Sequence, residues 1–131
     1  MRYPVAIWAG NGAYSAEVPD LPGVITEADS ISELEDMVKE AAYGWMEAEL
    51  DDSRSIPDPT SVEHFSSDDV YKDCMWMLVD LDMDKISDKV ERVNVCLPSR
   101  ALRRLDFLAS NAGTSRSSYL ARAIYTMNAQ I

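Results

Sequence analysis

Several residue types that catalysis, metal binding or membrane insertion require are scarce in this chain of 131 residues. Its only histidine, His64, lies in a polar stretch and has no serine or cysteine and aspartate arranged around it as a nucleophilic triad. The two cysteines, Cys74 and Cys96, form no close-spaced metal motif, and we expect free thiols. No apolar run reaches the length of about eighteen residues that a transmembrane helix needs, and the first residues do not resemble a secretory signal. We therefore expect a cytoplasmic protein that is not an enzyme.

Basic side chains are scarce in the first two thirds of the chain. Residues 1–84 carry four basic and twenty acidic side chains, a net charge of −16, whereas residues 85–131 carry eight basic and three acidic ones, a net charge of +5. This division predicts an acidic domain over residues 1–84, a hinge over residues 85–89 and a basic domain over residues 90–131. The acidic part should repel nucleic acid, and the basic part should attract it.

The pattern of residues 1–84 predicts an α+β domain. Apolar residues alternate on both sides of Gly10-Asn11-Gly12, which indicates a β-hairpin. A third strand is expected over residues 24–27. Ser30 and Glu33 form a capping box, and the helical spacing of the apolar residues behind them predicts an amphipathic helix over residues 31–50. Ile56-Pro57-Asp58-Pro59 ends the helical region and begins a polar loop rich in serine and aspartate. The apolar run at residues 74–79 predicts a fourth strand. We expect an antiparallel sheet with one helix on one face.

The last forty residues predict one strand followed by two short helices. Residues 90–97 alternate, with Val93, Val95 and Leu97 on one side and Arg92, Asn94 and Cys96 on the other. Pro98 ends the strand, and Ser99 is the predicted N-cap of a helix that Gly113 terminates. Thr114 and Ser115 cap a second helix whose apolar residues recur at helical spacing: Leu120, Ala123, Ile124 and Met127.

Such a segment is too small to fold alone, because its strand has no neighbour and its two apolar helical faces have no cover. A second copy supplies both, so we expect a homodimer or a larger oligomer with paired strands. A two-stranded ribbon fits the DNA major groove. The predicted base-reading residues are Arg92, Asn94 and Cys96, and the predicted phosphate-binding residues at the second helix N-terminus are Ser115, Arg116 and Ser117.

Two resemblances follow from these residues. Arg92 to Leu97, Pro98-Ser99 and Gly113 to Ser118 resemble the ribbon-helix-helix family of dimeric repressors. The N-terminal part resembles HicB antitoxins in the segments 12–16, 18–23 and 56–59. That resemblance implies a partial RNase H-like domain joined to a DNA-binding module. It also implies a type II antitoxin that inhibits a HicA-type mRNA-cleaving toxin and represses its own operon by binding operator DNA.

The candidate toxin-binding residues are Asp20, Glu27 and Asp29, because a net charge of −16 suits a partner with a basic, RNA-gripping surface. We expect no catalytic residues, since no spacing marks the carboxylate cluster that two-metal hydrolysis needs. We also expect no cofactor, no metal and no membrane partner. A calcium-loop pattern at Asp80, Asp82, Asp84, Asp88 and Glu91 is rejected because Lys85 stands where that loop needs glycine.

A second interpretation keeps the same fold. In it the chain is a stand-alone ribbon-helix-helix transcriptional regulator whose N-terminal domain senses a ligand. A neighbouring reading frame that encodes a small basic protein of toxin size would decide against it.

Overall fold

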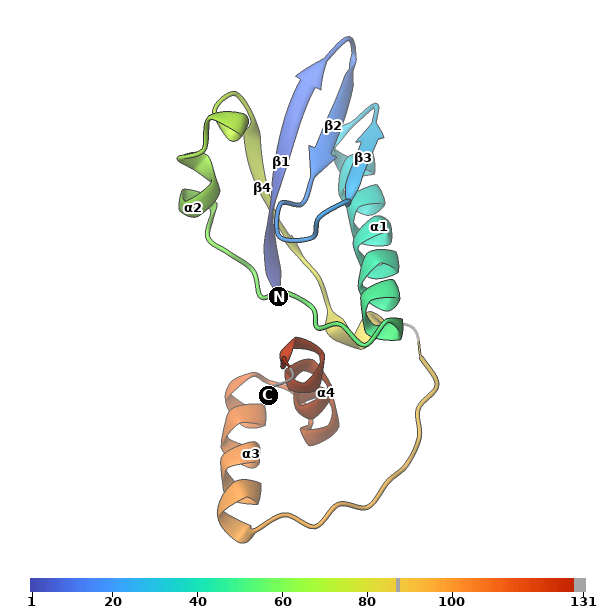
Figure 1. Ribbon diagram of the computed structural model, residues 1–131, viewed down its shortest axis with the longest axis vertical. Helices are drawn as coiled ribbons and strands as arrows, with labels where there is room; N and C mark the ends of the chain where they lie inside the picture. Colours follow the sequence, from blue (N-terminus) through green and yellow to red (C-terminus); the bar gives the residue numbers. More distant parts are fainter. Residues whose placement is uncertain (87, 129–131) are drawn as a thin grey trace.

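A four-stranded antiparallel sheet with one long helix on one face forms the first part of the molecule (Figure 1). The computed structural model describes residues 1–86 and 88–128. The strands lie in the order β3-β2-β1-β4, and every neighbouring pair is antiparallel: β1 (Arg2–Gly10), β2 (Ala13–Glu17), β3 (Ile25–Ala28) and β4 (Met75–Asp80). The α+β class predicted for this part is confirmed, and so are its four strands to within a residue or two.

The predicted hairpin is closed by a two-residue turn. Asn11 and Gly12 have φ angles of 54° and 76°, and Gly10 pairs with Ala13 on either side of them. Positive φ at both central residues matches the right-handed twist of the flanking strands, and asparagine followed by glycine adopts it at the lowest steric cost. The local sequence therefore fixes how β1 and β2 are paired.

The long helix α1 (Ile31–Asp51) begins where the capping box predicts. The Ser30 hydroxyl accepts a hydrogen bond from the Glu33 backbone N–H at 3.2 Å. One face of α1 is buried against the sheet, through Leu34, Val38, Ala42 and Met46. These residues pack on the side chains that the strands present at every second position, including Tyr3, Val5 and Ile7 of β1.

The core of the sheet domain continues past the last strand. Met83, in the short 3₁₀ helix η2 (Met83–Lys85), and Ile86 are both buried in the same cluster as the sheet residues. The folded unit thus reaches Ile86, which lies within the segment predicted as a hinge, residues 85–89. Ser87, in the middle of that segment, lies outside the described residues.

The polar stretch between Pro59 and the fourth strand was expected to be a loop, but it contains two short helical segments. These are α2 (Val62–Ser66) and the 3₁₀ helix η1 (Asp69–Tyr71). They return the chain from α1 to β4 and place Phe65 and Tyr71 against aromatic residues of the sheet. The loop prediction was wrong there, because elements of three to five residues are too short to show a periodic pattern.

The second part of the chain is an extended segment followed by two helices (Figure 1). Residues 88–98 are extended and pair with no other described strand, so the strand predicted at 90–97 is absent from a single chain. Helix α3 (Ser99–Asn111) and helix α4 (Arg116–Thr126) follow as predicted, separated by Gly113 with a φ of 66°. The N-cap of α3 is Pro98, and Ser99, predicted as the cap, is the first helical residue.

Helix α4 docks on the lower end of the sheet domain. The Ile56 backbone N–H donates to the Tyr125 carbonyl at 2.8 Å, and the Tyr125 side chain packs against the core of the first part. Arg122 forms an ion pair with Asp84 of η2 at 3.5 Å. These contacts hold one side of α4 on the sheet domain, while Leu120, Ile124 and Met127 stay exposed on the helix.

A buried tyrosine ties β1 to the segment after α1. The Tyr3 hydroxyl donates to the Pro57 carbonyl at 2.6 Å, and burial, with the nearby Asp20 and Asp58 carboxylates, keeps the Tyr3 pKa far above its ordinary value. Tyr3→Phe leaves that carbonyl without its donor, and we expect a loss of about 1–2 kcal/mol in the free energy of unfolding. Urea denaturation measures it. Tyr14→Phe, on the same sheet face, is the control, and an equal loss in both variants would contradict the assignment.

Candidate functional site

The extended segment carries the three predicted base-reading residues on an exposed stretch of chain. Arg92, Asn94 and Cys96 are all exposed, and no ion pair or hydrogen bond within the described part of the chain engages their side chains. The apolar residues between them are exposed too: 74% for Val93, 72% for Val95 and 43% for Leu97. Exposed valines at alternate positions of an unpaired extended segment are unusual on the surface of a monomeric protein. They indicate that this segment binds a partner.

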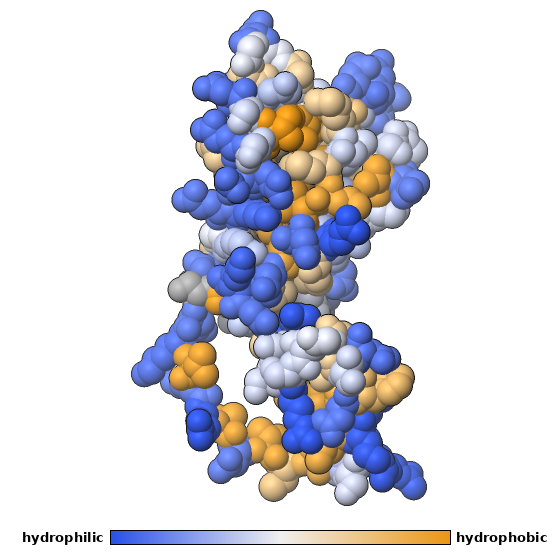
Figure 2. Space-filling view, turned by 180° about the vertical axis from the view of Figure 1, so that it is seen from behind, coloured by the Kyte–Doolittle hydropathy of each residue, from blue (hydrophilic) through white to orange (hydrophobic). Residues whose placement is uncertain are grey.

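A groove separates the extended segment from the two helices that follow it. Its apolar lining comes from the segment, from Leu102 and Leu105 of α3 and from Leu120 of α4. In the space-filling view, apolar residues run along this segment, which stands away from the helices over part of its length (Figure 2). The unpaired extended segment and the apolar residues of α3 and α4 therefore line the same groove.

The predicted phosphate-binding residues lie at the start of α4. The Ser115 hydroxyl accepts from the Ser118 backbone N–H at 3.1 Å, so it caps the helix. Ser117 is exposed in the first turn. The Arg116 guanidinium donates to both carboxylate oxygens of Asp106, at 2.5 and 2.9 Å, and these bonds lower the pKa of Asp106 and raise that of Arg116. Sequence reasoning missed this partner, because Asp106 lies ten residues away on α3.

Three further arginines lie on α3. From the sequence they were counted only in the net charge of residues 85–131 and were not named as site residues. Arg100, Arg103 and Arg104 are exposed along the first turns of the helix, and the Arg104 guanidinium lies 5.7 Å from the centre of the Phe107 ring. Together with Arg116 they make the helical part of the chain the cationic end of the molecule.

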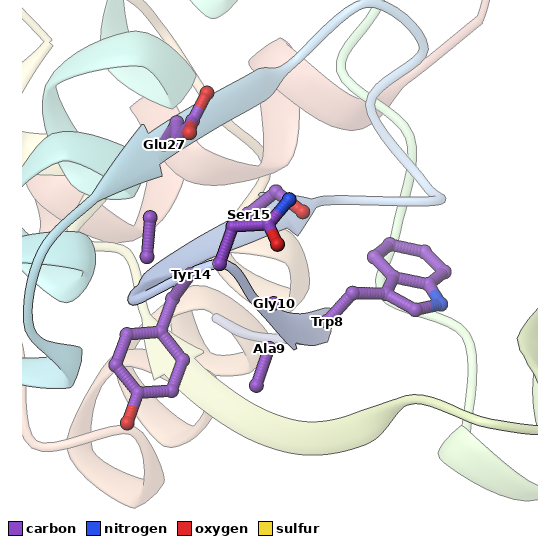
Figure 3. Close-up of a pocket in the computed structure, with 8 residues that line it drawn as sticks. Trp8, Ala9, Gly10, Tyr14, Ser15 and Glu27 are labelled. Atoms are coloured by element: carbon purple, nitrogen blue, oxygen red, sulfur yellow. The ribbon is translucent and has the colours of Figure 1, made fainter.

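The predicted toxin-binding carboxylates do not converge on one point. Asp20 accepts from the Thr60 backbone N–H at 2.9 Å and from the Thr60 hydroxyl at 2.6 Å, so it ties two loops together. Asp29 is exposed just before α1. Glu27 is exposed on β3, opposite Ser15, and shares a shallow hollow with Trp8 at the tip of the hairpin (Figure 3). Of the three, Glu27 alone lies on the sheet face that points away from α1.

The remaining sequence candidates are dispersed as well. Asp80 lies 3.2 Å from the Met1 ammonium, Asp84 pairs with Arg122, and the Asp82 side chain caps η2. Within residues 1–86 and 88–128 no group of three histidine, cysteine or acidic side chains could hold a metal ion. His64 is exposed on α2 and packs edge-on against Phe65, and both cysteines are free thiols. No helix in the described part of the chain is long and apolar enough to cross a membrane.

Fold and charge together define a bipartite α+β protein, with an acidic sheet-and-helix part joined by an extended segment to a cationic pair of helices. A sequence model of the family described as HicB-like antitoxin of bacterial toxin–antitoxin systems matches residues 3–124. The chain therefore belongs to the HicB-like antitoxins.

Individual relatives are similar over 63% to 98% of this chain. A 14.9 kDa protein from the rep-hol intergenic region of Haemophilus phage HP1 is 32% identical over 124 residues, 93% of each chain. The crystal structure of antitoxin HicB from Burkholderia pseudomallei is 29% identical, with a TM-score of 0.81 over 98% of this chain and 99% of that one. A chain of the HicA3–HicB3 toxin–antitoxin complex, 21% identical, shares the fold over 63% of this chain and 99% of its own length, with a TM-score of 0.52.

Proposed function

We propose that the acidic sheet domain binds and inhibits a HicA-type mRNA-cleaving toxin, and that the cationic helical part binds operator DNA as a ribbon-helix-helix dimer and represses the shared operon. The observation that carries the proposal is the division of charge between two structurally distinct parts, one of −16 and one of +5. An RNA-cleaving toxin must attract RNA, so its RNA-binding surface should be cationic. Such a surface should attract the acidic sheet domain and should not attract the cationic helical part.

The dimer proposal is supported by the unpaired segment and its groove. Val93, Val95 and Leu97 alternate with Arg92, Asn94 and Cys96, and the apolar set lines the groove against α3 and α4. If two copies pair these segments antiparallel, the apolar side chains are covered and the polar ones face outward. Arg92 and Asn94 are then on the DNA side, with the side-chain chemistry that reads guanine and adenine.

The toxin proposal is supported by family membership and by a solved relative. The HicA3–HicB3 complex contains a chain that shares the fold of this one. The alternative, a stand-alone regulator with a ligand-sensing first domain, needs a ligand cavity there. The hollow at the hairpin tip is lined by Trp8, Tyr14, Ser15 and Glu27 together with alanine, glycine and asparagine, and its volume of about 160 Å³ is below the roughly 300 Å³ at which ligand pockets usually begin.

A fragment tests the division of labour between the two parts. Because the core reaches Ile86, residues 1–86 form a better-bounded fragment than residues 1–84. Co-expressed with a HicA-type toxin that the full-length chain neutralises, this fragment should restore growth while failing to bind operator DNA. Residues 88–131 serve as the matched control and should not restore growth. Full toxicity with a soluble, folded 1–86 fragment would exclude the proposed role of the sheet domain.

A further inference from the structure

The sheet has one face that no long helix covers. Strand register places Ile25, Glu17, Ala6 and Trp76 side by side across all four strands on this face. Here we name it the open face. It comprises six residues from the strands and two from the segment between α1 and β4: Trp8, Glu17, Ile25, Glu27, Trp76, Leu78, Phe65 and Tyr71. Ile25 is 68% exposed and Leu78 is 46% exposed, although both lie on strands of the folded domain.

Half of the open face is a cluster of four aromatic rings. Phe65 stacks on Trp76 with their centres 6.2 Å apart, and Tyr71 lies 5.5 Å from Trp76 and 6.1 Å from Trp8. All four rings are only half-buried. Aromatic rings that are held in place by one another and remain accessible give large contact area at little entropic cost.

Carboxylates lie beside these rings without cations to balance them. Within the described chain, Glu17 and Glu27 form no ion pair, and the Glu17 carboxylate accepts only the Tyr71 hydroxyl, at 3.4 Å. The adjoining η1 segment adds the exposed Asp68, Asp69 and Asp73. Carboxylates next to aromatic rings form the environment that an arginine or lysine side chain from another molecule would satisfy, through ion pairing and cation–π contact.

The outer surface of α1 is also acidic, with exposed carboxylates at Asp36 and Glu40, but it differs from the open face in how its aromatic residues are engaged. Its Glu35 is already paired with Lys39 at 3.4 Å. Its aromatic residues are used within the domain, since the Trp45 indole N–H donates to the Pro22 carbonyl at 2.8 Å and the Tyr43 hydroxyl accepts from the Asp82 backbone N–H at 2.9 Å. Among the described residues, the open face therefore combines carboxylates outside ion pairs with accessible aromatic and aliphatic side chains, whereas Tyr43 and Trp45 of α1 are bonded within the domain.

We propose that the open face is the surface that docks the toxin, and that its occupant is the cationic, RNA-gripping surface of a HicA-type protein. The inference rests on the proposed function and deepens it by naming the contact surface. Lysine or arginine side chains of the toxin pair with Glu17 and Glu27 and lie against the aromatic cluster, while Ile25 and Leu78 contact apolar residues between them. The toxin surface that holds RNA is then covered by antitoxin.

Two matched pairs of substitutions test this surface in the full-length protein. Glu27→Lys and Leu78→Lys change exposed open-face residues, and Glu40→Lys and Met37→Lys make the same changes at exposed positions of α1. The probe is a HicA-type protein, purified after co-expression with this chain, and its affinity is measured by calorimetry. We expect each open-face variant to weaken binding by at least about tenfold and each α1 variant to change it by less than about twofold.

The outcomes separate this inference from the proposed function. A wild-type chain that does not bind the HicA-type protein would overturn the proposed function itself. Wild-type binding that the open-face variants leave unchanged, or that the α1 variants weaken equally, would overturn the inference alone. Should a variant fail to fold, amide hydrogen exchange of the wild-type complex decides the matter. We expect the toxin to protect residues 62–73, and protection confined to α1 would contradict the docking surface.

Discussion

Val95→Asp is expected to convert the protein to a monomer and to weaken operator binding by at least about a hundredfold. In the proposed dimer Val95 lies on the apolar side of the paired segments, above the groove lined by Leu102, Leu105 and Leu120. Each copy in such a dimer contributes one aspartate, so the variant buries two like charges that have no partners. Sedimentation at micromolar concentration and DNA binding to the region upstream of the gene measure the two effects.

The neighbouring residue supplies the control. Cys96→Asp introduces the same charge one position along the chain, on the side predicted to face DNA. We expect this variant to stay dimeric and to lose DNA affinity through repulsion by phosphate. If Val95→Asp remains a dimer, or if both variants become monomers, the alternation that defines the ribbon is wrong. Wild-type protein that sediments as a 14.6 kDa monomer would contradict the dimer directly.

Arg92→Ala and Arg116→Ala are expected to weaken DNA binding in different ways. Arg92 is exposed at the edge of the groove in the single chain, and in the proposed dimer strand alternation turns it toward DNA. Its loss should then cost about 1–3 kcal/mol on the operator and relax the preference for it over random DNA. Arg116 lies at the N-terminus of α4, and its loss should weaken binding to all sequences alike. The log–log salt dependence should then flatten by about one unit per site.

The ion pair of Arg116 refines this prediction. Asp106 accepts from Nε and Nη2 of the guanidinium, so phosphate has to compete with a carboxylate for that edge. Asp106→Asn should therefore strengthen binding to operator and random DNA alike, the opposite of Arg116→Ala. Affinities for both DNAs at several salt concentrations test all three variants. If Arg92→Ala leaves the preference for the operator unchanged, the extended segment is not the element that reads the DNA sequence.

Local signals in the sequence predicted most of the sheet domain. The Asn11-Gly12 turn, the Ser30 cap with Glu33 and the apolar spacing along α1 each act within a few residues, and each is found where expected. Strand alternation also placed Tyr3, Val5 and Ile7 on the buried face. Such features are determined by neighbouring residues, so a sequence read without its tertiary structure already contains them.

Long-range contacts could not be predicted in the same way. Nothing near Tyr125 in the sequence indicates that it packs on the sheet domain beside Ile56, some seventy residues earlier. The open face depended on α2 and η1, whose few residues show no period, and Phe65 and Tyr71 had been assigned to a polar loop. The ion pair between Asp106 and Arg116 could not be predicted either, because the two residues lie on different helices and only the turn between α3 and α4 brings them together.

The exposure of residues 88–98 bears on how long a single molecule survives. Endoproteases bind their substrates in extended form, and this segment offers eleven consecutive extended, exposed residues between two folded parts. In the proposed dimer the same backbone is paired and hidden, so cleavage is confined to dissociated copies. Dilution produces more of those copies by mass action. The degradation rate per molecule would then fall as the concentration of the protein rises, and dilution of the protein by cell growth would shorten the lifetime of each remaining molecule.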